Sequence, residues 1–137
     1  MINISQDIYT YLASVTAVTD IASSRIWADR NTPPKTYRPD DGPAIAFAAR
    51  GGLPAYDSRI LRVSYKFKFY GATNSPTVSP QLSAVNLYRA TYDALQDRAF
   101  ASVRWGGCEV IAQQLEEFAL NWPYTLAFFE FVPINSG

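Results

Sequence analysis

The sequence predicts a single α+β domain, with a mixed, mostly antiparallel β-sheet of about five or six strands and two main helices packed on one face. Alternating apolar and polar side chains predict a strand at Arg59–Tyr70. Apolar residues at helical spacing predict a helix from about Pro80 to Ala99. The chain has 137 residues, of which 48% are hydrophobic, and this is enough for one buried core. We therefore expect residues 1–137 to form one domain.

The N-terminal segment predicts a helix of about three turns, because its apolar residues form one narrow stripe. The stripe consists of Ile4, Ile8, Tyr11, Leu12 and Val15. Asn3 or Ser5 is the expected N-cap. A second, shorter helical piece capped by Thr19 is expected within Thr16–Ser24, and a short strand follows at Arg25–Ala28.

The segment Asp29–Pro43 is predicted to be a flexible surface loop. It holds four of the nine prolines, so its backbone cannot sustain a regular ladder or helix. Long loops are usually functional or disordered, and we favour a binding function. A strand is expected at Ala44–Arg50, followed by a turn at Gly51–Pro54. This strand and the next one, Arg59–Tyr70, should pair as a hairpin.

The register of the Arg59–Tyr70 strand is well specified by its two faces. The apolar face consists of Leu61, Val63, Tyr65, Phe67 and Phe69. Arg62, Ser64, Lys66 and Lys68 fall on the other face. A slip of one residue would place two lysines and an arginine in the core, so the sequence disfavours it.

A second flexible surface loop is predicted at Gly71–Ser79. Ser79 is the expected N-cap of the next helix, and Pro80 occupies its first position, where a missing N–H is harmless. The expected buried stripe of this helix is Val85, Tyr88, Tyr92, Leu95 and Ala99.

The C-terminal part predicts three strands. Ala101–Trp105 and Cys108–Leu115 are expected to be joined by a two-residue hairpin turn at Gly106-Gly107. The stretch Gln113–Glu117 could instead be helical. Tyr124–Val132 is apolar on both faces and should close the sheet.

Composition argues against several function classes. The chain has no histidine, which is the commonest general base at neutral pH and the commonest metal ligand. Twelve basic and 12 acidic residues give zero net charge, so no global field favours nucleic acid or an anionic membrane. One cysteine excludes an internal disulfide, and no apolar run could span a bilayer. We expect an unsecreted soluble protein that is not an enzyme and uses no metal or cofactor.

Few residues suggest catalysis. The pairs Asp40-Asp41 and Glu116-Glu117 could divide acid and base roles, but adjacent residues of an extended chain point to opposite faces. We interpret both pairs as solvated surface. Cys108 has no histidine to activate it and is expected to act as a small hydrophobe.

A basic line on the polar face of the Arg59–Tyr70 strand has three interpretations. Arg62, Lys66 and Lys68 could be a solvated surface, a charged subunit contact or, beside Tyr70, a surface for single-stranded nucleic acid. The solvated surface is the commonest case. The tryptophans are expected to be core or interface anchors: Trp27, Trp105 and Trp122.

The final strand raises the question of what covers the second face of the sheet. Leu126 and Phe128 point to one side, while Phe129 and Phe131 point to the other. Both main helices are expected on one face. A curled sheet, the long loop or a neighbouring subunit must cover the other, and we expect an oligomer.

The order of elements carries a resemblance to a known family. The matching features are IYTYLASVTAVTDIASSRIWADRNTPP with its Ile8 and Leu12 helix, the strand beginning Arg25-Ile26, the proline-bearing loop, Ala44–Phe47, Val63–Phe69, the Ser/Pro connector, Leu82–Leu95 and the terminal aromatic strand. In this order the chain resembles the small tail-completion or tail-terminator proteins of tailed bacteriophages, related to the U protein of lambda-like phages.

The resemblance implies a structural virion protein. Its subunits would form a homo-oligomeric ring, usually hexameric, that caps the tail tube, stops its growth and helps join tail to head. The implied partners are other copies of the chain, the tail-tube protein and head connector or neck proteins. No small-molecule substrate or membrane is implied, and nucleic acid only as DNA passing through the ring lumen. The implied location is the head–tail junction of the virion, after synthesis in the host cytoplasm.

The family resemblance implies two sets of contact residues. The candidate tube or connector contacts are Arg30, Lys35, Tyr37, Arg38, Asp40, Asp41, Thr73 and Asn74. The candidate subunit contacts are Arg62, Lys66, Lys68, Trp105, Phe129 and Phe131. Deletion of Pro34–Asp41 is expected to leave the fold intact and abolish tail joining.

Other functions stay open. A head-completion or neck protein would bind the portal side of the same joint, and genome position would separate the two. A small carboxylate-based enzyme would need an Asp or Glu with a strongly raised pKa inside a cavity. A ligand-binding module would need one closed apolar pocket.

Overall fold

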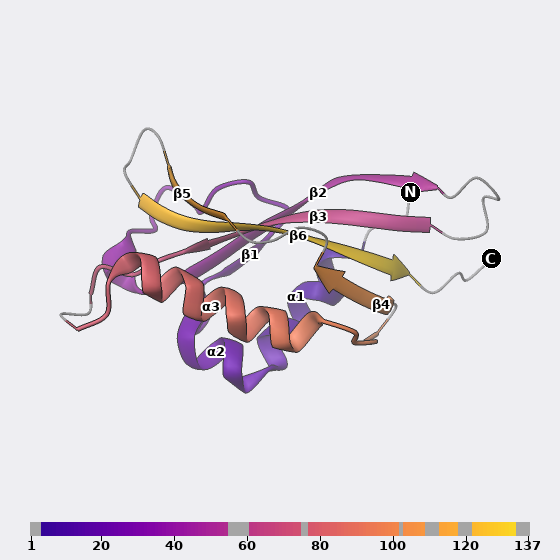
Figure 1. The fold of residues 1–137 in the computed structure, drawn as a ribbon, viewed down its shortest axis with the longest axis horizontal. Helices are drawn as coiled ribbons and strands as arrows, with labels where there is room; N and C mark the ends of the chain where they lie inside the picture. Colours follow the sequence, from indigo (N-terminus) through magenta and orange to yellow (C-terminus); the bar gives the residue numbers. More distant parts are fainter. Residues whose placement is uncertain are drawn as a thin grey trace.

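The computed structural model places three α-helices on one face of a six-stranded sheet (Figure 1). It describes residues 4–54, 61–74, 77–101, 103–108, 113–117 and 122–133, without the side chains of residues 50–54, 61–62 and 113–117. Its elements are α1 (Ser5–Ser14), α2 (Thr16–Ala22), β1 (Ile26–Ala28), a 3₁₀-helix (Pro39–Asp41), β2 (Ala44–Pro54), β3 (Leu61–Tyr70), α3 (Pro80–Leu95), β4 (Val103–Cys108), β5 (Gln113–Glu117) and β6 (Trp122–Pro133). The fold is α+β, as the sequence predicts.

The sheet is mixed and mostly antiparallel. Its strand order is β1-β2-β3-β6-β4, and β5 lies beside β6 as well. Only β1 and β2 run parallel among the described pairs, while β2–β3, β3–β6, β4–β6 and β5–β6 are antiparallel. The predicted hairpin of β2 and β3 is confirmed. Their pairing makes β3, with β6 on its other side, the central strand of the sheet.

The predicted register of β3 is confirmed by burial. Val63, Tyr65, Phe67 and Phe69 are at most 1% exposed and face the helices. The Phe67 ring stacks on Phe47 with 4.9 Å between ring centroids. Because the lysines of β3 lie on the opposite face, the core keeps its apolar character only in this register.

Helix α3 is shorter than predicted and rotated from the predicted face. It ends at Leu95, because Gln96 is extended and Asp97 has a φ of 56°, so the expected end at Ala99 is wrong. Its buried residues are Ser83, Ala84, Leu87, Thr91, Ala94 and Leu95. The predicted buried stripe is displaced from the observed buried face by about one residue around the helix. Tyr88 and Tyr92, which were expected to be buried, are only half-buried. Small side chains let the helix approach the sheet, while the tyrosines reach the border of the core.

The two N-terminal helices are present, but their predicted caps are wrong where the structure describes them. Ser5 is the first residue of α1 rather than its N-cap, and α2 begins at Thr16 rather than after Thr19. The Ser5 hydroxyl donates to Asp29 Oδ1 at 2.6 Å and lies 2.9 Å from the Tyr65 hydroxyl. This polar contact ties α1 to the central strand. The other predicted cap, Asn3, lies outside the described residues.

Replacement of either buried hydroxyl should destabilise the domain. Ser5→Ala removes the contacts of this hydroxyl with both Asp29 and Tyr65, whereas Tyr65→Phe removes the contact with Ser5, which keeps its bond to Asp29. Loss of a buried hydrogen bond costs about 1–3 kcal/mol, and Ser5→Ala should cost more than Tyr65→Phe. The double variant should cost less than the sum, because both single changes remove the same Ser5–Tyr65 contact. Urea unfolding of the two single variants and the double variant measures this. Strictly additive losses would contradict the contact.

The predicted hairpin turn at Gly106-Gly107 is wrong. Both glycines lie inside β4, and β4 and β5 follow each other along β6 instead of pairing together. A Cβ at Gly106 would lie 2.9 Å from Cδ1 of Phe131, so glycine here permits a close approach to the core. Gln113–Glu117 is a strand and not a helix.

The predicted turn at Gly51–Pro54 is also wrong, because β2 continues to Pro54. The pairing of β2 with β3 shifts between Ala49 and Gly51, which is the mark of a β-bulge. The two glycines therefore accommodate an irregularity within the strand. Residues 55–60, which connect β2 and β3 in the sequence, lie outside the described residues.

Candidate functional site

One end of the second face of the sheet is covered by an aromatic cluster. We use this name for Trp27, Tyr37, Tyr70, Trp122 and Tyr124. Tyr37 comes from the long loop and lies among the others, with its ring centroid 5.5 Å from Trp27 and 5.7 Å from Trp122. The long loop, one of the three covers considered from the sequence, therefore lies over this part of the sheet.

Hydrogen bonds hold the end of the long loop in place. The Tyr37 hydroxyl donates to the Gly42 carbonyl at 2.7 Å. Arg25 donates through Nε to the Pro43 carbonyl at 2.9 Å and through Nη2 to the Ile21 carbonyl at 3.3 Å. Gly42 has a φ of 126°, and a Cβ there would lie 2.3 Å from Arg25 Nη2. Glycine thus lets the loop close over the arginine.

The two predicted surface loops meet in the folded chain. The Thr73 amide donates to the Pro39 carbonyl at 3.2 Å, and the Thr73 hydroxyl donates to the Asp40 carboxylate. On the connector side, the Ala72 amide donates to Ser83 Oγ at 3.1 Å. We call this surface the loop junction, formed by Lys35, Arg38, Asp40, Asp41, Thr73 and Asn74, all of them exposed.

The loop junction presents both charge signs on an anchored backbone. The Arg38 guanidinium donates to the Lys35 and Tyr37 carbonyls at 3.0 and 3.1 Å. The Arg38 amide donates to Asp41 Oδ2 at 3.1 Å, which caps the short 3₁₀-helix. Such a surface can bind a charged partner through polar contacts, and its residues need little reordering to do so.

Most of the predicted tube or connector contacts lie on the surface of the molecule. Arg30 and the six loop-junction residues are exposed. Tyr37 is 3% exposed and packs in the aromatic cluster, so its prediction as a partner contact is wrong. The physical reason is that the second face of the sheet needs apolar cover, and Tyr37 supplies it from the loop.

The predicted subunit contacts divide into three groups. Phe129 and Phe131 are 0% exposed in the core beneath the helices, so their prediction is wrong. Lys66, Lys68 and Trp105 are half-buried and remain candidates. Lys68 Nζ lies 5.0 Å from the centroid of the Tyr124 ring, and Trp105 Nε1 donates to Asp97 Oδ1 at 2.9 Å. The side chain of Arg62 lies outside the described residues.

Sequence reasoning missed the aromatic cluster and the anchoring role of Arg25. The cluster draws its rings from the long loop and from β1, β3 and β6, so no local periodicity marks it. The two tryptophans Trp27 and Trp122 were the available signal, since each was expected to anchor a core or an interface.

Alkaline pH should destabilise the fold. Burial is the main cause that raises the pKa of Tyr37 and of Tyr65 above the ordinary 10.0, with Arg25 opposing it at Tyr37 and the Ser5 hydrogen bond opposing it at Tyr65. Above about pH 10 the unfolded chain therefore binds fewer protons than the folded one, and the free energy of unfolding falls as pH rises. Urea unfolding between about pH 8 and pH 11 measures this fall, and Tyr37→Phe should flatten it. An equal slope in the variant would contradict the assignment.

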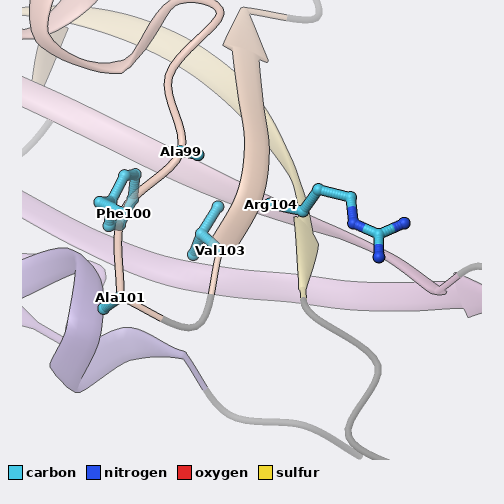
Figure 2. Close-up of a pocket in the computed structure, with 5 residues that line it drawn as sticks. All are labelled: Ala99, Phe100, Ala101, Val103 and Arg104. Carbon is cyan, nitrogen blue, oxygen red and sulfur yellow. The ribbon is translucent and has the colours of Figure 1, made fainter.

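The described residues offer little for catalysis. Every carboxylate whose side chain the structure describes is exposed or half-buried. No group of three or more His, Cys, Asp or Glu side chains in the described part could hold a metal ion. An open hollow of about 460 Å³ is lined by Ala99, Phe100, Ala101, Val103 and Arg104, and Figure 2 shows the Arg104 side chain extending away from the other four. This hollow is not the closed apolar pocket that a ligand-binding module requires. None of the helices in the described ranges is long and apolar enough to cross a membrane.

The class that the structure defines is a small α+β domain with a helix layer on one sheet face and a loop-capped aromatic cluster on the other. No protein-family model matches the sequence, and no curated protein matches it.

Proposed function

We propose that this chain is a structural virion protein whose subunits assemble as a ring, cap the end of a phage tail tube and help join the tail to the head. The observation that carries this proposal is the order of elements: α1, the short β1, the proline-bearing loop, the β2–β3 pair, α3 and the terminal aromatic strand β6. This is the order on which the resemblance to tail terminators rests.

A second observation supports a role in assembly. Beyond the aromatic cluster, the second face of the sheet carries half-buried side chains of mixed character. They include Ala48, Lys66, Leu126, Phe128 and Val132, and the pair Ser64 and Glu130 lies on the same face. A face that mixes aromatic, aliphatic and charged groups suits contact with another protein. We assign this face to subunit contacts and the loop junction to the tube or the head connector.

Because Tyr37 is buried, the loop deletion considered from the sequence does not separate binding from folding. Deletion of Pro34–Asp41 would remove Tyr37 from the aromatic cluster, so the expected intact fold of that variant no longer follows. Charge changes on exposed side chains separate binding from folding more cleanly. Lys35 meets this requirement because it is exposed. Arg38 is exposed as well, but its guanidinium donates to two loop carbonyls, so the single variant Lys35→Glu accompanies the double variant as the check on loop conformation.

Reversal of the two basic charges of the loop junction should weaken tube capping. The double variant Lys35→Glu with Arg38→Glu is expected to fold and to lose about tenfold or more in affinity for tube ends, because charge reversal places like charges against the partner. Negative-stain counts of capped tubes across a concentration series measure the affinity, and circular dichroism checks the fold. Arg89→Glu, an exposed site on α3, is the control. Unchanged capping by the double variant would remove the loop junction from the contact.

The function itself is tested with the wild-type chain. Light scattering across a concentration series reports the mass in solution. Negative-stain imaging follows, with purified phage tail tubes added. Rings in solution and density at tube ends are expected, and tube ends that stay open at every concentration would overturn the proposal.

A further inference from the structure

We propose that the segment Gln96–Ala101 blocks the outer edge of β4 against pairing with a strand of another chain. We call this segment the edge strap. It follows α3, which ends at Leu95, and precedes β4, which begins at Val103. Figure 2 shows its last part running beside β4. This role does not depend on the proposed ring, because an open sheet edge favours unwanted association in any folded chain.

β4 is the last strand at one side of the described sheet, whose order is β1-β2-β3-β6-β4. One edge of β4 pairs with β6 between Val103 and Cys108. No described strand pairs with its other edge. The backbone N–H and C=O groups of such an edge form a template on which a strand of another chain can add. These groups therefore need other partners if the chain is to stay free of edge pairing.

The edge strap supplies such partners along β4. The Asp97 amide donates to the Gly106 carbonyl at 2.8 Å. The Cys108 amide donates to Oε1 of Gln96 at 3.0 Å. The Trp105 indole donates to Asp97 Oδ1 at 2.9 Å and so fixes the residue that covers Gly106. A strand added at this edge would have to use the Gly106 carbonyl and the Cys108 amide, and the strap already occupies both.

A tight reversal holds the end of the edge strap against the start of β4. The Phe100 amide donates to the Val103 carbonyl at 2.9 Å, and the Val103 amide donates to the Phe100 carbonyl at 2.7 Å. Two residues of the strap, Asp97 and Ala101, have φ values of 56° and 45°. A residue other than glycine rarely adopts a positive φ, because its Cβ then crowds the backbone. The strap keeps this unfavourable backbone because its hydrogen bonds and its contact with the core offset the cost.

Phe100 anchors the edge strap to the core. Its side chain is 9% exposed. Its ring stacks on Tyr11 of α1 with 4.2 Å between the ring centroids, and it meets the Phe131 ring edge to face at 6.2 Å. The Tyr11 hydroxyl donates to the Ala94 carbonyl at 2.7 Å, which holds the Tyr11 ring in this position. Lifting the strap away from β4 would expose these rings to water, so the strap stays closed in the folded chain.

The strand at the other end of the described sheet order is protected differently. β1 spans only Ile26–Ala28, and a very short edge strand gives another chain few groups to pair with. Both end strands are therefore poor sites for the addition of a strand. Association between copies is left to the side chains of a sheet face, in agreement with the assignment of subunit contacts to the second face.

A variant that releases the edge strap tests this role. It combines Gln96→Ala, which removes the acceptor of the Cys108 amide, with Asp97→Pro. Proline at position 97 has no amide to donate to Gly106 and cannot adopt the φ of 56°. Because α3 ends at Leu95, the change does not interrupt the helix. The released variant should remain folded by circular dichroism and form larger assemblies than the wild type at equal concentration, measured by sedimentation velocity across a concentration series.

Two further variants are the controls. Leu87→Ala truncates a side chain of α3 that is 0% exposed, so it destabilises the core while the hydrogen bonds of the strap stay in place. It should keep the assembly state of the wild type. Hydrogen exchange of the Cys108 amide should become about five- to tenfold faster in Gln96→Ala. Gln96→Glu keeps a side-chain oxygen as acceptor and should leave this exchange slow.

Larger assemblies of the released variant, absent from Leu87→Ala, would support the block at the β4 edge. A released variant that keeps the mass of the wild type at every concentration would overturn it, and so would equal association by Leu87→Ala. Where the double variant does not fold, Gln96→Ala alone decides: faster exchange of the Cys108 amide together with larger assemblies supports the role of the strap, and any other result overturns it.

Discussion

Phe67→Ala is expected to destabilise the domain by about 3–5 kcal/mol, the usual cost of truncating a buried aromatic side chain. Phe67 is 0% exposed at the centre of β3. Its ring stacks on Phe47 and meets Phe129 edge to face at a centroid distance of 5.1 Å. Because small domains are stable by about 5–15 kcal/mol, this one change should leave a substantial unfolded fraction at moderate temperature.

Urea and thermal unfolding measure the loss caused by Phe67→Ala. Phe67→Leu keeps most of the apolar volume and should lose much less stability. Leu82→Ala is the surface control, because Leu82 is 48% exposed. A cost for Phe67→Ala within about 0.5 kcal/mol of that control would mean that β3 does not hold the core together.

Gly71→Ala should cost about 3 kcal/mol or more, at the upper end of the range for overpacking. A Cβ at Gly71 would lie 1.8 Å from the Pro80 carbonyl oxygen, which belongs to the backbone at the start of α3. Neither group can rotate away, so the connector or the helix must move. The Gly71 amide donates to the Pro123 carbonyl at 3.1 Å, and this bond should lengthen. Movement of the connector would also separate Thr73 from Asp40 in the loop junction.

Gly107→Ala is the matched control for Gly71→Ala. Its Cβ would lie 2.4 Å from Cη2 of Trp105, so the indole must move and give up its bond to Asp97, but the three nearest atoms belong to this side chain and not to the backbone. Urea unfolding compares the two variants, and hydrogen exchange of the Thr73 amide reports the loop junction. Faster exchange is expected in Gly71→Ala alone. Equal losses of stability with unchanged exchange would show that the connector accommodates the methyl group.

The sequence was sufficient for elements whose signal is local. The alternation in β3 predicted its faces because every second side chain of a strand points the same way. The apolar stripe of α1 and the Ser79-Pro80 start of α3 were predicted for similar reasons, and the structure has both, with Leu82 N–H donating to Ser79 Oγ at 3.2 Å. Exposure of the charged loop residues followed from the cost of burying unpaired charge.

Tertiary contacts decided what the local pattern could not. Gly106-Gly107 has the composition of a hairpin turn, yet both glycines pair with β6, opposite Phe131 and Glu130, and so lie within β4. The hydrogen bond between Thr73 and Asp40 links residues 33 positions apart in the sequence. It depends on how α3 and the sheet position the loop after β3. The sequence could not decide whether Tyr37 is exposed or buried, because its phenol is compatible with either solvent or a core.

By itself, the sequence determined the α+β class, the hairpin of β2 and β3, the face of β3 and the loop character of 29–43 and 71–79, because these follow from spacing along one segment. Only the tertiary structure decided that the two loops meet, that Tyr37 covers the sheet and that Phe129 and Phe131 lie in the core. The physical reason is that β6 is apolar on both faces, so its sequence cannot say which face meets the helices. That choice depends on pairing with β3, whose lysines must remain on the other side.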